Sequence, residues 1–132
     1  MANAAVYLEY DEPIMDSIGE TVYVPAQGEE PARYEFEVKG IQMALNVMDR
    51  QEVPQHLNGL WGFVSRFPES NPNKQDALDR VTRVRNVLGL IAKPEFEEVP
   101  ELWYAICKLA YDNKGFIFSG ASIYLPDGSM LI

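Results

Sequence analysis

Apolar residues recur in this sequence with the spacing of strands in some segments and of helices in others. The order of these segments limits the folds that the chain can adopt. In residues 33–38, apolar side chains alternate with Glu35 and Glu37, as in a strand with one buried face and one wet face. Residues 5–10 and 21–24 are short and rich in β-branched and aromatic side chains, so we expect strands there as well. Prolines and glycines between these segments predict turns, and the three strands form a small antiparallel meander.

The middle of the chain mixes helical and extended patterns. Apolar residues at helical spacing predict helices at residues 41–50 and 73–88, and Pro100 suits the first turn of a third helix. Residues 60–67 and 90–92 are short, mostly apolar stretches, so we expect strands. Helices and strands therefore alternate through the middle of the chain.

Residues 116–118, 123–125 and 130–132 predict three more strands, the last two joined as a terminal hairpin. The resulting order is βββ-α-β-α-β-α-βββ. It favours an α+β fold, in which a mixed, mostly antiparallel sheet carries about three helices packed mainly on one face. A mixed-sheet α/β layer is the alternative. Because the chain has no repeat and no long linker, we expect a single globular domain over residues 1–132.

The net charge of −9 is concentrated at one end of the chain. Residues 1–38 hold nine acids and only one base, Arg33, whereas the remainder has a balance of −1. Such a field repels phosphate-rich partners and attracts basic ones, so we expect no nucleic-acid binding. Arg80 and Arg83 lie one turn apart on a predicted helix, where we expect them to pair with acids of the chain or to be solvated. A solvated acidic face is the plain alternative to a binding surface.

Composition also bears on compartment and cofactors. No apolar run is long enough to cross a membrane, and the beginning MANAAVYLEYDEP lacks the basic residues of an export signal. The single cysteine, Cys107, permits neither an internal disulfide nor a multi-cysteine zinc site. We therefore predict a cytoplasmic location and no membrane partner. Phosphate-loop, dinucleotide and calcium-loop motifs are missing, so we predict no cofactor and no metal site.

Two residues are weak candidates for catalysis. His56 is the only histidine, and together with Cys107 and an asparagine, either Asn58 or Asn113, it has the residue types of a thiol hydrolase. No local signature surrounds them. A loop histidine bonded to the backbone and a buried apolar cysteine explain the same residues, so we assign no catalytic residue.

The absence of catalytic motifs and the segregated charge together favour a non-enzymatic protein-binding module with an acidic face for a basic partner. Glu35, Glu37, Asp11 and Glu12 are the predicted contacts. In size, acidity and mixed composition the chain resembles small bacterial proteins, including immunity proteins that inhibit a toxin by binding it. Two alternatives remain: a small enzyme with His56 in a cleft, and a structural homo-oligomer whose strands pair with a second copy.

Overall fold

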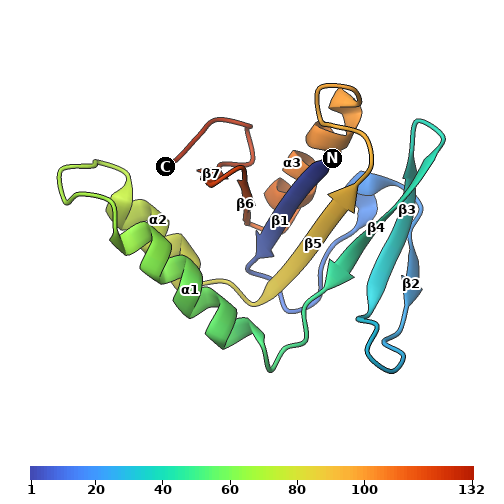
Figure 1. Ribbon diagram of the computed structural model, residues 1–132, viewed down its shortest axis with the longest axis horizontal. Helices are drawn as coiled ribbons and strands as arrows, with labels where there is room; N and C mark the ends of the chain where they lie inside the picture. Colours follow the sequence, from blue (N-terminus) through green and yellow to red (C-terminus); the bar gives the residue numbers. More distant parts are fainter.

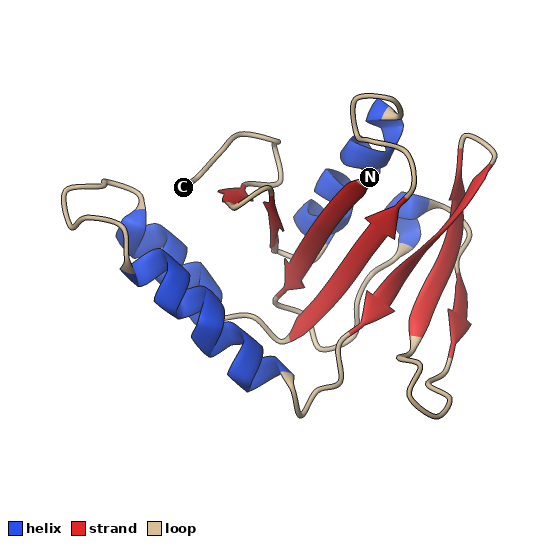
Figure 2. Cartoon of the chain, viewed as in Figure 1, coloured by secondary structure: helices blue, strands red, loops and turns tan.

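The computed structural model describes residues 1–132 and contains three helices and one seven-stranded sheet (Figures 1 and 2). The elements in chain order are β1 (Ala2–Leu8), the 3-10 turn η1 (Asp16–Ile18), β2 (Val22–Val24), β3 (Arg33–Val38), β4 (Ile41–Val47), α1 (Val53–Ser65), α2 (Lys74–Thr82), β5 (Asn86–Ala92), α3 (Pro100–Asp112), β6 (Phe116–Ser119) and β7 (Ser122–Tyr124). The strands lie in the order β2-β3-β4-β5-β1-β6-β7, and every neighbouring pair is antiparallel. The predicted α+β class, with an antiparallel sheet and three helices, is confirmed.

The first face of the sheet packs against α3, which lies behind β1 in Figure 1. Val6 of β1 and Leu88 of β5 point to this face, where they meet Leu102, Ile106 and Leu109 of α3. All five side chains are fully buried. Because side chains of a strand alternate between faces, every second residue of β1 and β5 belongs to this core.

The second face packs against α1, α2 and the C-terminal segment, but only over part of its area. Tyr7 and Val87 point this way and join a separate core with Val64 of α1 and Val81 of α2. The helices therefore divide between the two faces, with α1 and α2 on the second face and α3 alone on the first. The reason is that β1 buries Val6 on the first face and Tyr7 on the second, so each face needs its own cover.

Residues 41–50, predicted as a helix, instead contain β4. Met43 and Leu45 point into the first core, and β4 pairs with β3 in a register that sets Val38 opposite Ile41. The two residues between the strands, at positions 39 and 40, have φ of 53° and 75°. Positive φ at both central positions is typical of the two-residue turns that join antiparallel strands, and this hairpin excludes the helix.

Residues 60–67, predicted as a strand, mostly lie in α1. Pro54 occupies the first turn of that helix, where its missing N–H costs no hydrogen bond. Val53, Leu60 and Val64 follow helical spacing and are the buried residues of α1. The helical spacing was missed because it begins at Val53, before the aromatic stretch at residues 60–67 that predicted a strand.

The predicted terminal hairpin is only partly correct. β7 forms, but residues 130–132 do not make a strand. Met130 forms one isolated bridge with Tyr124, and Leu131 donates its backbone N–H to the carbonyl of Ile123 at 2.7 Å. The chain end is thus tied to β7 without forming a further strand.

The boundary between α2 and β5 also differs from the prediction. The helix predicted at residues 73–88 ends as α2 at Thr82, because residues 86–92 pair with the whole length of β1. Only residues 90–92 of this strand were predicted. None of the three helices combines the length and the apolar character needed to cross a membrane.

Candidate functional site

Part of the second sheet face has no helix over it, and a groove of about 990 Å³ lies there. Its floor comes from three central strands: Asn3 and Ala5 of β1, Asn46 of β4, and Gly89 and Ile91 of β5. Gly89 pairs with Ala5 on one side and with Asn46 on the other. Because Gly89 and Ala5 are small, no large side chain fills the middle of the groove. Ile91 remains 63% exposed.

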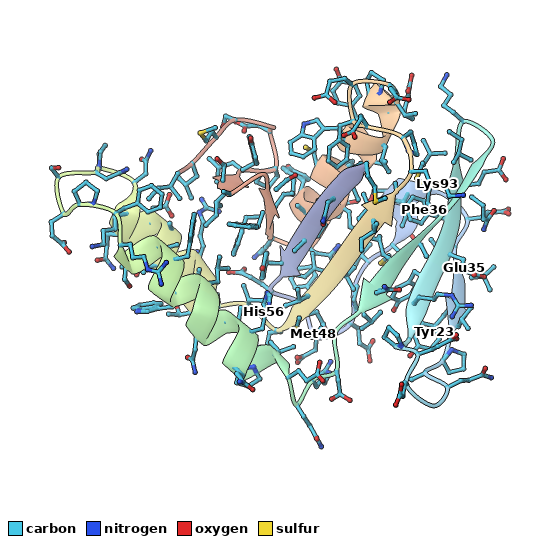
Figure 3. All side chains as sticks on the ribbon, in the orientation of Figure 1. Tyr23, Glu35, Phe36, Met48, His56 and Lys93 are labelled. Atoms are coloured by element: carbon cyan, nitrogen blue, oxygen red, sulfur yellow. The ribbon has the colours of Figure 1, made fainter.

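Two loops form the walls of the groove. One wall is the connection between β2 and β3, including Gly28 and Pro31, and the other runs from Met48 into the start of α1. Figure 3 shows Met48 and His56 on the α1 side of the sheet and Tyr23 on the β2 side. The two walls stand on opposite sides of the uncovered strands, so the groove is open above the floor.

Acidic side chains are the main charges on these walls. Glu29 and Glu30 come from the β2 side, and Asp49 and Glu52 come from the α1 side. The only basic side chain in the lining is Arg50, so the lining carries a net charge of −3 when the histidine is neutral. The groove is therefore acidic, like the chain as a whole.

Few of these carboxylates are neutralised within the chain. The guanidinium of Arg50 already contacts Asp11, with 3.4 Å between Nη1 and Oδ1 and a 2.7 Å hydrogen bond from Nη2 to the backbone carbonyl. Glu30 has only a 3.9 Å contact with Arg33. The other three wall carboxylates form no ion pair. These groups are free to meet a positive ligand.

The residues predicted to contact a partner lie around the groove rather than in its lining. Glu35 and Glu37 are on the same sheet face as the groove, because Phe36 between them is buried in the first core. Glu35 accepts a hydrogen bond from Nε of its strand neighbour Arg33 at 3.2 Å, and Figure 3 shows it on the β2 side.

The other two predicted contacts lie in the segment after β1. Asp11 is exposed and reaches the wall through its contact with Arg50, whereas Glu12 is exposed in the same segment. Sequence reasoning counted the wall acids in the total charge but did not select them. The sequence did contain a signal for the wall acids on the β2 side. The prolines at positions 25 and 31 mark a loop between two strands, and acidic residues in such a loop project from the edge of the sheet.

His56 lines the groove on the α1 wall. It is exposed, and its Nε2 lies 2.7 Å from the hydroxyl oxygen of Tyr7. The two rings are stacked with centroids 5.7 Å apart, and Tyr7 stacks in turn on Phe116 at 4.8 Å. Burial raises the pKa of Tyr7 to about 12, so this hydroxyl stays protonated at neutral pH. The hydrogen bond leaves only Nδ1 of His56 for another partner.

The structure does not bring His56 and Cys107 together. Cys107 is buried in the α3 core on the first sheet face, whereas His56 lies on the second. Burial, with a smaller effect of the Asp127 charge, raises the pKa of the Cys107 thiol to about 11. Such a thiol has little thiolate at neutral pH and is a poor nucleophile.

Neither asparagine completes a catalytic arrangement with this cysteine. Asn58 is exposed on α1. Asn113 is fully buried at the end of α3, where its side chain accepts a hydrogen bond from the backbone N–H of Ile14 at 2.7 Å and donates one to the Ile14 carbonyl at 2.9 Å. Its role is to hold the segment after β1 against α3. The chain contains no group of three or more histidine, cysteine or acidic side chains that are placed to hold a metal ion.

The basic helix predicted from sequence pairs with acids of the chain. Arg80 contacts Asp76 at 2.9 Å within α2, and Arg83 contacts Glu9 at 2.5 Å. The second contact joins the helix to the acidic N-terminal third, as expected for intramolecular pairing.

Comparisons with known proteins yield no relative. No protein-family model matches the chain, and neither a curated protein nor a solved structure is found to match it. The function is therefore argued from the groove itself.

Proposed function

We propose that this chain is a non-enzymatic protein-binding module whose open groove takes a basic, extended segment of a partner. One observation carries the proposal: carboxylates stand on both walls of an uncovered sheet face, and three of the four have no ion-pair partner in the chain. An inhibitory or immunity-type protein is one form that such a module takes.

The charge of the walls favours a basic partner over an acidic or neutral one. Convergent charges in a concave site raise the local concentration of oppositely charged groups and speed association by about 10-fold to 1,000-fold at low salt. Glu35 and Glu37 lie on the same sheet face and extend the field beyond the groove. Glu35 and Glu37 would then mainly speed the first encounter with the partner, and the wall carboxylates would contact it in the bound complex.

The floor suits an extended polypeptide. Asn3 and Asn46 are exposed, and each side-chain amide offers both a donor and an acceptor to a backbone. Ile91 offers exposed apolar area on the same face. A segment that alternates basic and apolar residues would set apolar side chains on the floor and direct basic ones to the walls.

A peptide titration with matched charge variants tests this proposal. The probe is a peptide of about twelve residues that alternates lysine and valine, followed by fluorescence anisotropy, and its counterpart alternates glutamate and valine. Wild-type protein should bind only the lysine peptide. The double variant Glu29→Lys and Glu52→Lys removes one carboxylate from each wall and should weaken binding by at least about tenfold.

The control variant is Asp79→Lys with Glu98→Lys, which changes the net charge equally with two exposed acids outside the groove. It should weaken binding by less than about threefold at physiological salt, where exposed charges are screened over about 8 Å. Equal losses in the two double variants would mean that net charge alone attracts the peptide, and the groove proposal would be wrong.

A small enzyme is the second candidate, and the position of His56 in the groove favours it. Tyr7 holds the imidazole ring through Nε2, so Nδ1 is the nitrogen left to face a bound ligand. Nδ1 accepts a proton in the tautomer whose Nε2–H donates to the Tyr7 oxygen. A His56→Gln variant separates the two candidates. An enzyme would lose turnover with any substrate it accepts, whereas the binding module would keep its affinity for the lysine peptide.

A further inference from the structure

A second, smaller pocket of about 460 Å³ lies apart from the groove, and four of its nine lining residues are aromatic. Phe96 comes from the segment before α3, Trp103 and Tyr104 come from the first turns of α3, and Tyr124 comes from β7. The two pockets share no lining residue. Its volume lies within the range of about 300–1,000 Å³ that is usual for small-molecule sites.

The rings hold one another in place. Phe96 and Trp103 meet nearly edge to face, with centroids 5.1 Å apart and an angle of 70° between their planes. Trp103 and Tyr124 meet in the same way at 5.3 Å and 85°. Such pairs are favourable and fix the ring orientations before any ligand arrives.

The turn after β7 closes on the same indole. Gly128 has φ of 87°, and a Cβ built there would lie 3.5 Å from Nε1 of Trp103. That distance is an ordinary van der Waals contact, so it is the positive φ of the turn, and not a lack of space beside the ring, that favours glycine at this position. Tyr104, by contrast, is 69% exposed, so its ring stands at the mouth of the pocket with little contact to the rest of the chain.

The pocket has one charged side chain, the carboxylate of Glu97, and no lysine, arginine or histidine in its lining. Two neighbouring acids already have partners: Glu95 pairs with the N-terminal amine, and Glu101 pairs with Lys39 at 3.7 Å. Glu97 forms no ion pair. A negative charge without a partner therefore stands beside an aromatic wall.

We infer that this pocket binds the quaternary ammonium group of a small organic cation. The faces of aromatic rings are negative and attract cations, and a methylated ammonium loses little hydration when it contacts them. Glu97 adds the opposite charge at the same site. An anionic ligand would be repelled by that carboxylate, and a neutral apolar ligand would make no use of it.

Intrinsic fluorescence gives a direct assay. The chain has two tryptophans, and the other, Trp61, lies on α1 outside this pocket, so a Trp61→Phe variant leaves Trp103 as the only reporter. Choline is the probe, and 3,3-dimethyl-1-butanol is its neutral counterpart of nearly equal shape. The account predicts a saturable change with choline and at least about tenfold weaker binding of the alcohol, with calorimetry as a second readout.

Three variants in that background test the assignment. Tyr104→Ala and Glu97→Gln should each weaken choline binding by at least about threefold, while Glu98→Gln, which changes a neighbouring exposed acid outside the lining, should not. Melting curves should show that all three variants remain folded.

Four outcomes would overturn the inference: no saturation by choline in either readout, equal binding of the alcohol, unchanged binding in Glu97→Gln, or equal losses in Glu97→Gln and Glu98→Gln. N-acetyl-trimethyllysine methyl ester serves as a further arm. If this ester binds about tenfold more tightly than choline, the natural ligand is a peptide with a methylated lysine, and the inference of a small organic cation is wrong. Neither result bears on the acidic groove, because the lysine peptide is assayed separately.

Discussion

The two faces of the sheet are built from the same strands, but only one of them is closed. On the first face, Leu90 of β5 is completely buried beneath α3, with Leu102 and Ile106 over the sheet. On the second face, the next residue of the same strand, Ile91, is 63% exposed. Two adjacent aliphatic side chains of one strand thus have opposite environments.

The difference shows that burial in this fold is decided by what covers a face and not by the hydrophobicity of its residues. Full burial of an isoleucine side chain is worth about 1.5–3 kcal/mol relative to exposure, and Ile91 forgoes most of that stabilisation in the free chain. A partner laid across the groove would recover part of it. A ligand therefore gains most binding free energy from apolar contact on the open face. Substitutions on that face also lower the stability of the fold least.

Removing residues 126–132 should have the largest effect on stability. Leu131 and Ile132 are buried against the α1 and α2 side of the second face, and at about 1.5–3 kcal/mol each their loss should cost about 3–6 kcal/mol. Urea denaturation measures the change. Met130→Ala is the control, since Met130 is 60% exposed, and it should cost less than about 0.5 kcal/mol. An unchanged unfolding midpoint in the truncated protein would show that the chain end is a dispensable tail.

Truncating one leucine on the closed face should have the next largest effect. Leu88→Ala should cost about 2–5 kcal/mol, because it leaves a cavity under α3 that the packed sheet cannot fill. Ile91→Ala, three residues further along the same strand on the open face, should cost less than about 1 kcal/mol. Similar losses in the two variants, measured by urea denaturation, would mean that the two faces do not differ in packing.

The buried thiol on the closed face should make stability depend on alkaline pH. The pKa of Cys107 is about 11 in the folded chain against an ordinary value of 9.0, so between these values the folded chain keeps a proton that the unfolded chain releases. The stabilisation from the thiol is complete below pH 9 and is lost as pH rises towards 11, by at most about 2.7 kcal/mol.

The matched comparison is with Cys107→Ala, which lacks this titration. The stability difference between wild type and variant should shrink from pH 8 to pH 10.5. Labelling by a thiol reagent at neutral pH should also be much slower for the native chain than for the unfolded one. A difference that does not change with pH, together with fast native labelling, would contradict the buried position of the thiol.

At the border between the covered and open parts of the second face, a smaller effect is expected. Tyr7→Phe removes the hydrogen bond to His56 and should cost about 0.5–1.5 kcal/mol, because the exposed imidazole can turn to water. Thermal denaturation measures the loss. A variant as stable as the wild type would show that the contact orients the histidine without stabilising the fold.

The strand pattern at positions 33–38 and the helix beginning at Pro100 were predictable because one periodicity fits each of them. Residues 41–48 fit two: Ile41, Leu45 and Met48 match a helix, while Met43 and Leu45 match a strand. The hairpin turn at positions 39 and 40 decides between them. Gly40 suits a positive φ, but Lys39 gives little local indication of one, so the two-residue turn is apparent only once the strands are paired.

The candidate site was less predictable than the fold. A groove whose walls come from two loops on opposite sides of the sheet depends on strand order, which places β5 between β4 and β1 although β1 and β5 are far apart in sequence. No short-range pattern encodes that arrangement. The charge imbalance of residues 1–38 pointed to acids but could not separate Glu29, which lines the groove, from Glu35, which lies beside it. It also left out Glu52, which lies beyond that segment.

The most direct test of the acidic groove is to map where the alternating lysine and valine peptide binds, by backbone amide chemical-shift changes in a labelled sample. The account predicts that the largest changes occur in residues 28–32, 46–52 and 89–91, on the open face, and that they fade as salt is raised. Amides of α3 should remain unaffected. Changes centred on α3 or α2, or spread evenly over all exposed acids, would contradict the claim that the uncovered face of the sheet is the binding surface.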